Sequence, residues 1–168
     1  MIKHATASAF LFHRDPAAGW RTGLILHPRM GVWMMPGGHV EDDENSAEAV
    51  LREVREETGL ARVRLLTPHA PDGSAIVFAD SRPVDLPYWI VEHLIADGDN
   101  QLAQAHVHVD HKYLAVADDD AQVAAPAHPF QWRGRDALAE LPMLDDVRRG
   151  AEALFDVLTR AVPAGESR

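Results

Sequence analysis

Residues 46–58 constrain the fold of this chain more than any other segment, because they carry all the local signals of a helix. Asn45 can cap the first turn, and Glu48, three residues later, completes a capping box. Gly59 stands where helices commonly end in a left-handed residue. One face of the stretch is apolar at the 3.6-residue period; its members are Ala47, Val50, Leu51 and Val54. We therefore predict an amphipathic helix over residues 46–58.

Three carboxylates lie on one side of this expected helix. Glu53, Glu56 and Glu57 are three and four residues apart, so they are neighbours on the helix surface. Their mutual repulsion raises the pKa of each carboxyl group, and a hard cation with oxygen ligands, such as Mg²⁺, removes that penalty. Taken alone, three glutamates at this spacing more often form a solvated acidic face.

The residues around these glutamates favour the metal site, because the whole stretch from Gly38 to Leu60 resembles a complete Nudix box. The fixed positions of that pattern are filled by Gly38, Glu44, Arg52, Glu53, Val54, Glu56, Glu57, Gly59 and Leu60. The resemblance implies an enzyme that hydrolyses a diphosphate bond with a divalent cation. It also implies an α/β fold, the α/β/α sandwich with a mixed β-sheet that is typical of the family.

The resemblance assigns metal-binding roles to four residues. Glu53 and Glu57 are expected to be direct ligands of Mg²⁺, with Mn²⁺ as an alternative ion. Glu56 is expected to bind directly or through water, and it is a candidate base. The glycine loop before the helix often supplies a carbonyl oxygen in this family, and that role falls on Gly37.

Two further residues of the box are expected to act on the glutamates. Arg52 is expected to orient a glutamate, because a planar guanidinium suits a bidentate grip on a carboxylate. Glu44 is its expected partner or a remote electrostatic contributor. Many family members use a further carboxylate beyond the box as general base, and the candidates here are Asp97, Asp99, Asp118, Asp119, Asp120 and Glu140.

The rest of the sequence predicts strands around two helices. Residues 1–162 are expected to form a single Nudix hydrolase domain, with a frayed tail at 163–168. The segment Pro36-Gly37-Gly38 is typical of a tight turn. Strands are predicted at 6–12, 21–27, 61–66, 75–79, 88–95, 106–117 and 129–132, and helices at 134–141 and 145–161.

A second cluster of interest lies in the predicted strand at 106–117. His106, His108 and Asp110 alternate and should point to one side of the strand. The side chains could form an exposed polar face, contact substrate phosphates, bind a metal or line the interface of a homodimer. A zinc site is disfavoured because the spacing fixes no third ligand. Among the aromatic residues, Trp33 beside the glycine loop is the first choice to stack on a nucleobase.

Composition narrows the class of protein. Acidic residues outnumber basic ones 26 to 16, which gives a net charge of −10 and argues against general nucleic-acid binding. The chain has no cysteine and no apolar run of membrane-spanning length, and its N-terminus is typical of a strand rather than a signal peptide. We expect a cytoplasmic protein that acts on a small-molecule nucleotide and has no membrane partner.

The expected reaction is metal-dependent hydrolysis of a nucleoside di- or polyphosphate, with conversion of a nucleoside triphosphate to monophosphate and pyrophosphate placed first. Dinucleoside polyphosphate or ADP-ribose hydrolysis is the alternative. A non-catalytic nucleotide sensor is disfavoured because such domains commonly lose box glutamates. An isomerase of the isopentenyl diphosphate type is disfavoured because its chemistry uses a cysteine.

Overall fold

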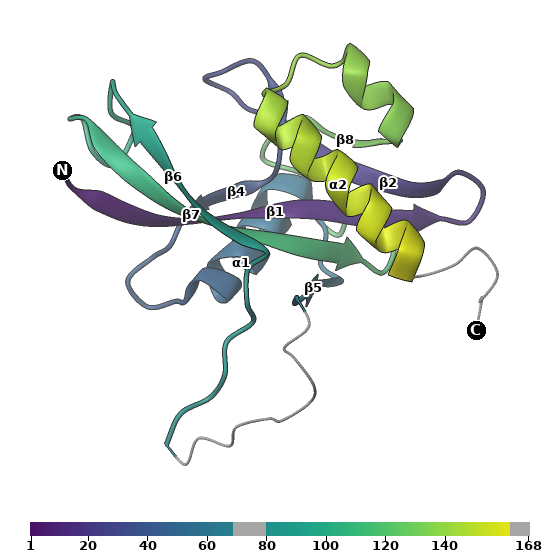
Figure 1. Ribbon diagram of the computed structural model, residues 1–168, viewed down its shortest axis with the longest axis horizontal. Helices are drawn as coiled ribbons and strands as arrows, with labels where there is room; N and C mark the ends of the chain where they lie inside the picture. Colours follow the sequence, from purple (N-terminus) through teal and green to yellow (C-terminus); the bar gives the residue numbers. More distant parts are fainter. Residues whose placement is uncertain (69–79, 162–168) are drawn as a thin grey trace.

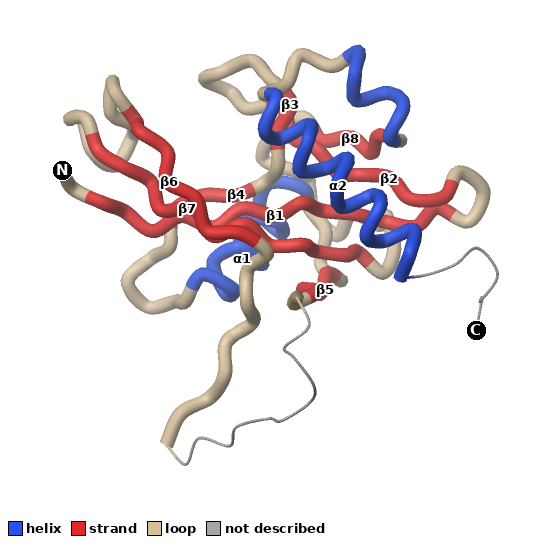
Figure 2. The backbone as a smooth tube through the Cα atoms, in the orientation of Figure 1, coloured by secondary structure: helices blue, strands red, loops and turns tan. Residues whose placement is uncertain are grey.

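The computed structural model describes residues 1–68 and 80–161, and eight strands in that part of the chain form one mixed sheet (Figures 1 and 2). The elements in chain order are β1 (Lys3–Asp15), β2 (Gly19–Leu26), β3 (Trp33–Met34), β4 (Gly37–His39), α1 (Ser46–Thr58), β5 (Val63–Leu66), β6 (Trp89–Ile95), β7 (His106–Ala117), β8 (Phe130–Arg133), the 3₁₀ helix η2 (Arg135–Glu140) and α2 (Asp145–Ala161).

Strands β1 and β7 form the centre of the sheet. They run parallel, with a register that extends from Lys3↔Val107 to His13↔Ala117. On the other side of β1 lie β2 and β4, both antiparallel to it. Strands β5 and β6 both pair antiparallel with β7, and β3 and β8 pair with β2. The short strand β4, which opens the box, is therefore fixed directly to the central strand.

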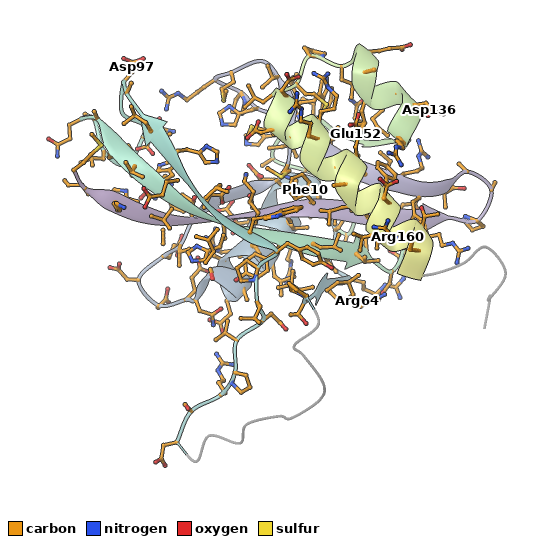
Figure 3. The ribbon with its side chains drawn as sticks, in the orientation of Figure 1. Phe10, Arg64, Asp97, Asp136, Glu152 and Arg160 are labelled. Carbon is orange, nitrogen blue, oxygen red and sulfur yellow. The ribbon has the colours of Figure 1, made fainter. Side chains whose placement is uncertain are left out.

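The two long helices cover opposite faces of this sheet, with α2 in front of it and α1 behind it in Figure 1. Alternate residues of β1 divide between the two faces, as the two-residue period of a strand requires. Ala9 and Leu11 pack on the α1 side, whereas Phe10 and Phe12 pack on the α2 side. Figure 3 shows Phe10 beneath α2. This arrangement confirms the predicted sandwich.

The predicted helix at 46–58 is confirmed with both of its bounds. Asn45 Oδ1 accepts hydrogen bonds from the backbone N–H groups of Ala47 and Glu48, and Glu48 Oε2 accepts one from the backbone N–H of Asn45. Gly59 ends the helix at a φ of 74°. The assignment of Leu51 to the buried face was wrong, because its side chain is 36% exposed while Ala49 is fully buried.

The predicted turn at Pro36-Gly37-Gly38 was also wrong, since both glycines belong to β4. Gly37 pairs with Ser8 and Gly38 with Ala7, in extended backbone. Glycine is needed here for close approach: a Cβ on Gly37 would lie 2.5 Å from the carbonyl oxygen of Ala7. Glycine is common both in tight turns and where two backbones approach closely, so the sequence alone did not distinguish a turn from a strand here.

The other predicted elements are present where the structure describes the chain. Most strand ends differ from the prediction by two residues or fewer, and β1 is three residues longer at each end. The segment predicted as a helix at 134–141 is the 3₁₀ helix η2. The strand expected at 75–79 and the tail at 163–168 lie outside the described residues. None of the described helices is both long and apolar enough to span a membrane.

Three glycine-to-alanine substitutions should separate backbone strain from steric clash. Gly19 has a φ of +74° with open space around it, so Gly19→Ala should cost about 1 kcal/mol of unfolding free energy. Gly59 has the same φ, but its added Cβ would lie 2.1 Å from the carbonyl oxygen of Ala124. Gly59→Ala should therefore cost roughly 2–4 kcal/mol, as measured by urea denaturation.

The matched control is Gly134→Ala, where φ is −71° and no atom lies within 4 Å of the added carbon. It should change the unfolding free energy by less than about 0.5 kcal/mol. Equal losses at Gly19 and Gly59 would contradict the close contact between the end of α1 and residue 124.

Candidate active site

Arg52, in the middle of α1, holds together the residues of the box. Its Nε and Nη2 donate to the two carboxylate oxygens of Glu44, at 3.1 and 2.6 Å. Nη1 donates to Glu53 Oε1 at 2.8 Å, and Nη2 also donates to the carbonyl oxygen of His39 at 3.0 Å. The pKa of the Arg52 guanidinium is raised, mainly by its hydrogen bonds to Glu44. The arginine therefore joins the loop before α1, the helix itself and the end of β4.

Glu57 is the most buried carboxylate of the box. Its Oε2 accepts a hydrogen bond of 2.8 Å from the backbone N–H of Gly37, and its Oε1 lies 3.4 Å from His128 Nε2. Burial raises the pKa of Glu57 to about 7, and the nearby charge of Glu53 acts in the same direction, whereas the hydrogen bond from Gly37 opposes the rise. A cation beside this carboxylate would favour its ionised form.

Glu53 packs against the backbone of β4. A Cβ on Gly38 would lie 2.3 Å from Glu53 Oε1, so only glycine leaves room for this carboxylate in its present place. Burial raises the pKa of Glu53, although its hydrogen bond to Arg52 opposes the shift. The glycine and the carboxylate therefore form a cradle that fixes the direction in which Glu53 points.

Glu56 is the exposed member of the three, with 58% of its side chain accessible. Its carboxylate lies 3.4 Å from Arg52 Nη1. Its carboxylate is therefore more open to water than those of the half-buried Glu53 and the buried Glu57.

Carboxylates of this kind fit a hard divalent cation. Glu53 and Glu57 both have a raised pKa because burial penalises their charge, and a cation with oxygen ligands offsets that penalty. Glu53, Glu56 and Glu57 are the residues that could hold Mg²⁺ or Mn²⁺. Carboxylate oxygens are the ligands that both ions prefer.

The second predicted cluster is not an exposed strand face, because two of its residues are buried and His108 is half-buried. His106 is fully buried, and its Nε2 lies 3.0 Å from His108 Nε2. Asp99 Oδ2 lies 3.2 Å from His106 Nε2, 3.0 Å from His108 Nε2 and 3.2 Å from His39 Nε2. Asp99, one of the candidate bases, is therefore surrounded by imidazoles.

Asp110 points to the same side of β7 but makes a different set of contacts. Its carboxylate accepts hydrogen bonds from Ser8 Oγ at 2.9 Å and Thr6 Oγ1 at 3.3 Å, and it pairs with Lys112 Nζ at 2.9 Å. Both Asp110 and Lys112 are buried. The hydrogen bonds of Asp110 join β7 to β1, and neither Asp110 nor Lys112 belongs to the cluster formed by Asp99 and the imidazoles around it.

The remaining candidate bases and the aromatic candidate lie elsewhere. Asp97 is exposed on the loop after β6, where Figure 3 shows it projecting from the end of the sheet. Asp118 and Asp119 pair with Arg64 and Arg62. Two more candidates are exposed, Asp120 and Glu140. Trp33 is half-buried and packs against the core on the α2 side.

His128 is a residue of the site that the sequence did not indicate. It approaches Glu57 from the segment before β8, and that segment is fixed to α1 by a hydrogen bond of 3.0 Å from the backbone N–H of Ala127 to the carbonyl oxygen of Glu56. More than 70 residues separate the two partners in sequence, so no local pattern could have joined them.

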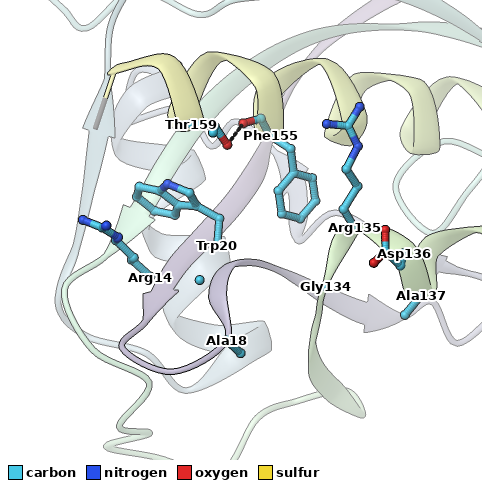
Figure 4. Close-up of a pocket in the computed structure, with 10 residues that line it drawn as sticks. Arg14, Ala18, Trp20, Gly134, Arg135, Asp136, Ala137, Phe155 and Thr159 are labelled. Carbon is cyan, nitrogen blue, oxygen red and sulfur yellow. Dashed lines mark hydrogen bonds between the residues drawn. The ribbon is translucent and has the colours of Figure 1, made fainter. Parts of the chain in front are cut away.

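A surface pocket lies apart from these carboxylates, between the β1–β2 turn, η2 and α2 (Figure 4). Its volume is about 540 Å³, and it is lined by Arg14, Ala18, Gly19, Trp20, Gly134, Arg135, Asp136, Ala137, Phe155 and Thr159. A smaller pocket of about 280 Å³ borders α1 near Arg52 and Leu60. Neither pocket is lined by the three glutamates, so we place the chemistry at the carboxylates and not at the larger hollow.

The raised pKa of Glu57 predicts how stability depends on pH without a divalent cation. The folded state holds this proton up to about pH 7, whereas the ordinary value is 4.5. Between these values the folded state binds more protons than the unfolded state, so stability falls as pH rises through this window. The loss should be about 3 kcal/mol and should be missing in Glu57→Gln.

The measurement is urea denaturation at pH 4.5 and 7.5 with a chelator present, comparing wild type with Glu57→Gln. The variant stays neutral throughout and keeps an acceptor for Gly37, so the difference between the two proteins isolates this carboxyl group. Identical pH profiles would mean that Glu57 ionises normally in the folded protein.

Comparisons with known proteins agree with the geometry of the box. The chain is 30% identical over 103 residues to the asymmetrical bis(5'-nucleosyl)-tetraphosphatase of Rattus norvegicus, an alignment that covers 60% of this chain and 68% of that protein.

Solved structures show the same fold. A hydrolase of the NUDIX family from Clostridium perfringens aligns over 94% of this chain and 99% of that chain, with a TM-score of 0.67 and 21% identity. The Ap4A hydrolase of C. elegans aligns over 96% and 100%, with a TM-score of 0.54 and 13% identity. The family model described as the NUDIX domain matches residues 3–141. The chain therefore belongs to the Nudix family and is a hydrolase of that family.

Proposed function

We propose that this protein hydrolyses a diphosphate bond in a nucleoside polyphosphate, that the reaction depends on Mg²⁺ or Mn²⁺, and that dinucleoside tetraphosphates are its first substrates. The observation that carries the proposal is the complete carboxylate set of α1, held by Arg52 and seated against β4. The similarity to the rat tetraphosphatase supports the substrate class. It moves dinucleoside polyphosphates ahead of the triphosphates that the sequence placed first.

The bound cation would bind phosphate oxygens and acidify water, which stabilises charge that develops during phosphoanhydride cleavage. Glu53 and Glu57 are the proposed ligands because Glu57 is buried, Glu53 is half-buried, and both lie against β4. Gly37 donates its N–H to Glu57, and its carbonyl oxygen is a further proposed ligand. Arg52 fixes the orientation of the Glu53 carboxylate and acts as a positioning residue, and its own guanidinium is held by Glu44.

Glu56 is the proposed base for the attacking water. Its side chain is more exposed than those of the other two glutamates, and it can accept a proton from solvent-side water. Trp33 remains the candidate to stack on the nucleobase.

The direct test is to incubate the pure protein with Mg²⁺ and diadenosine tetraphosphate, and in parallel with ordinary nucleoside triphosphates and ADP-ribose. Products are separated by ion-exchange chromatography. Formation of ATP and AMP from diadenosine tetraphosphate would support the proposal. Monophosphate and pyrophosphate from a triphosphate alone would return the assignment to a triphosphate pyrophosphohydrolase, and binding without turnover would indicate a sensor.

Removing the negative charge of Glu56 or of Glu57 should abolish most turnover. Glu56→Gln and Glu57→Gln are each expected to lower kcat by about 100-fold or more, since one loses the proposed base and the other a metal ligand. The control is Glu152→Gln on α2, which covers the other face of the sheet (Figure 3). Circular dichroism should show all three variants folded, and unchanged turnover in both box variants would remove the site assignment.

Gly38→Ala should act on the metal through Glu53. The added Cβ would occupy the position of the Glu53 carboxylate, which must then swing away. We expect kcat to fall at least about tenfold and the Mg²⁺ concentration for half-maximal rate to rise. Gly134→Ala serves as the matched control. A loss of stability with an unchanged Mg²⁺ requirement would show that Gly38 serves the fold alone.

A further inference from the structure

We propose that this protein has a second metal site, separate from the box, in which a zinc-class transition metal is bound by His39, Asp99, His106 and His108. One ligand atom from each of these four residues lies within 4.8 Å of every other. The proposal does not rest on the hydrolytic assignment, because none of the four residues is one of the box glutamates.

In the neutral form of His106, the hydrogen bond at Nδ1 leaves Nε2 without a proton to donate. Its Nδ1 lies 2.9 Å from the carbonyl oxygen of Gln104, which can only accept, so Nδ1 carries the proton in the neutral ring. Its Nε2 therefore presents a lone pair to Asp99 Oδ2 at 3.2 Å, and a carboxylate oxygen is also an acceptor. A cation between the two atoms resolves this contact between acceptors.

The other imidazoles turn toward the same oxygen. His108 Nε2 lies 3.0 Å from both Asp99 Oδ2 and His106 Nε2. His39 Nε2 is buried and lies 3.2 Å from Asp99 Oδ2, yet it makes no well-directed hydrogen bond within the described residues. In a tetrahedral zinc site, neighbouring ligand atoms are about 3.3 Å apart. The three contacts of Asp99 Oδ2 and the contact between His106 and His108, at 3.0–3.2 Å, are close to that spacing.

The support around the ligands is typical of a metal site. Asp99 Oδ1 accepts the backbone N–H groups of Gln101 and Leu102 at 2.9 and 2.8 Å, which leaves Oδ2 facing the imidazoles. Gly98 allows this tight loop at a φ of +70°, where an added Cβ would lie 2.5 Å from backbone atoms. Hydrogen bonds of this kind fix the orientation of ligands before the metal arrives.

The ligand set also selects the kind of ion. Three imidazole nitrogens and one carboxylate oxygen suit Zn²⁺ and neighbouring transition metals, whereas Mg²⁺ prefers oxygen ligands. The chain would therefore hold two ions of different chemistry. The sequence disfavoured a zinc site for want of a third ligand after His106 and His108, and the fold supplies two, from β4 and from the loop before β7.

The test is zinc uptake in the presence of excess Mg²⁺. The protein is stripped with a chelator, incubated with Zn²⁺ and millimolar Mg²⁺, passed through a desalting column and analysed for zinc. We expect one tightly held zinc ion per chain. Substitution by Co²⁺ should give the visible absorption of a tetrahedral ion, and zinc should raise the Tm of the wild-type protein.

Asp99→Asn and His108→Asn should each weaken zinc binding by at least about 100-fold and remove the rise in Tm. Asp99→Asn keeps an oxygen for the two backbone N–H groups, so it tests the ligand without removing the loop's hydrogen bonds. The matched control is His13→Gln at the opposite end of β1, which should bind zinc as the wild type does.

The double variant Glu53→Gln/Glu57→Gln should lose hydrolysis and keep its zinc, which separates this proposal from the proposed function. Wild-type protein that retains no zinc, or variants that retain as much as the wild type, would overturn the second site. Zinc lost in the glutamate variant and retained in Asp99→Asn would place the ion in the box instead.

Discussion

The site depends on one half-buried guanidinium. Arg52 contacts Glu44, Glu53 and the carbonyl oxygen of His39, which belong to a loop, a helix and a strand. Each hydrogen bond to a carboxylate is charge-assisted. The planar guanidinium directs its N–H donors at fixed angles, whereas the ammonium group of a lysine would not hold its partners in fixed directions. Its positive charge also makes it possible to keep several carboxylates within one small volume. The orientation of the metal-binding side of α1 follows from this arginine.

The sheet supplies the other half of the constraint. Strand β4 is only three residues long, yet it pairs with the central strand β1 and brings two glycines against α1. Because Gly37 and Gly38 have no side chains, the helix approaches closely enough for Glu57 to accept the N–H of Gly37. The carboxylates therefore lie against paired backbone, and β4 ends at His39, which is one of the four residues of the proposed second site. One short strand connects the two proposed metal sites.

The features that were predicted correctly from the sequence are those that depend on residues close together in the chain. The bounds of α1, its caps and the neighbouring glutamates follow from residues within one or two turns, and α2 followed from its period in the same way. The turn assigned to Pro36-Gly37-Gly38 was wrong because glycine serves both turns and close approach. The cluster of His39, Asp99, His106 and His108, like the contact of His128 with Glu57, joins distant segments. Such pairings depend on strand order, which no spacing in a single sequence encodes.

The parallel pairing of β1 with β7 has a consequence for how the chain folds during synthesis. Each register pair joins residues 104 positions apart, from Lys3↔Val107 to His13↔Ala117. Strand β1 leaves the ribosome long before its main partner. Until β7 has been synthesised, β2 and β4 can pair with one edge of β1, while the edge that β7 will occupy stays unpaired. Closing so long a loop is slow, and the contacts between β1 and β7 that stabilise it can form only after β7 has been synthesised. The helix that carries the chemistry can form early, but its supporting surface is completed last, so the nascent chain depends on protection of one exposed strand edge.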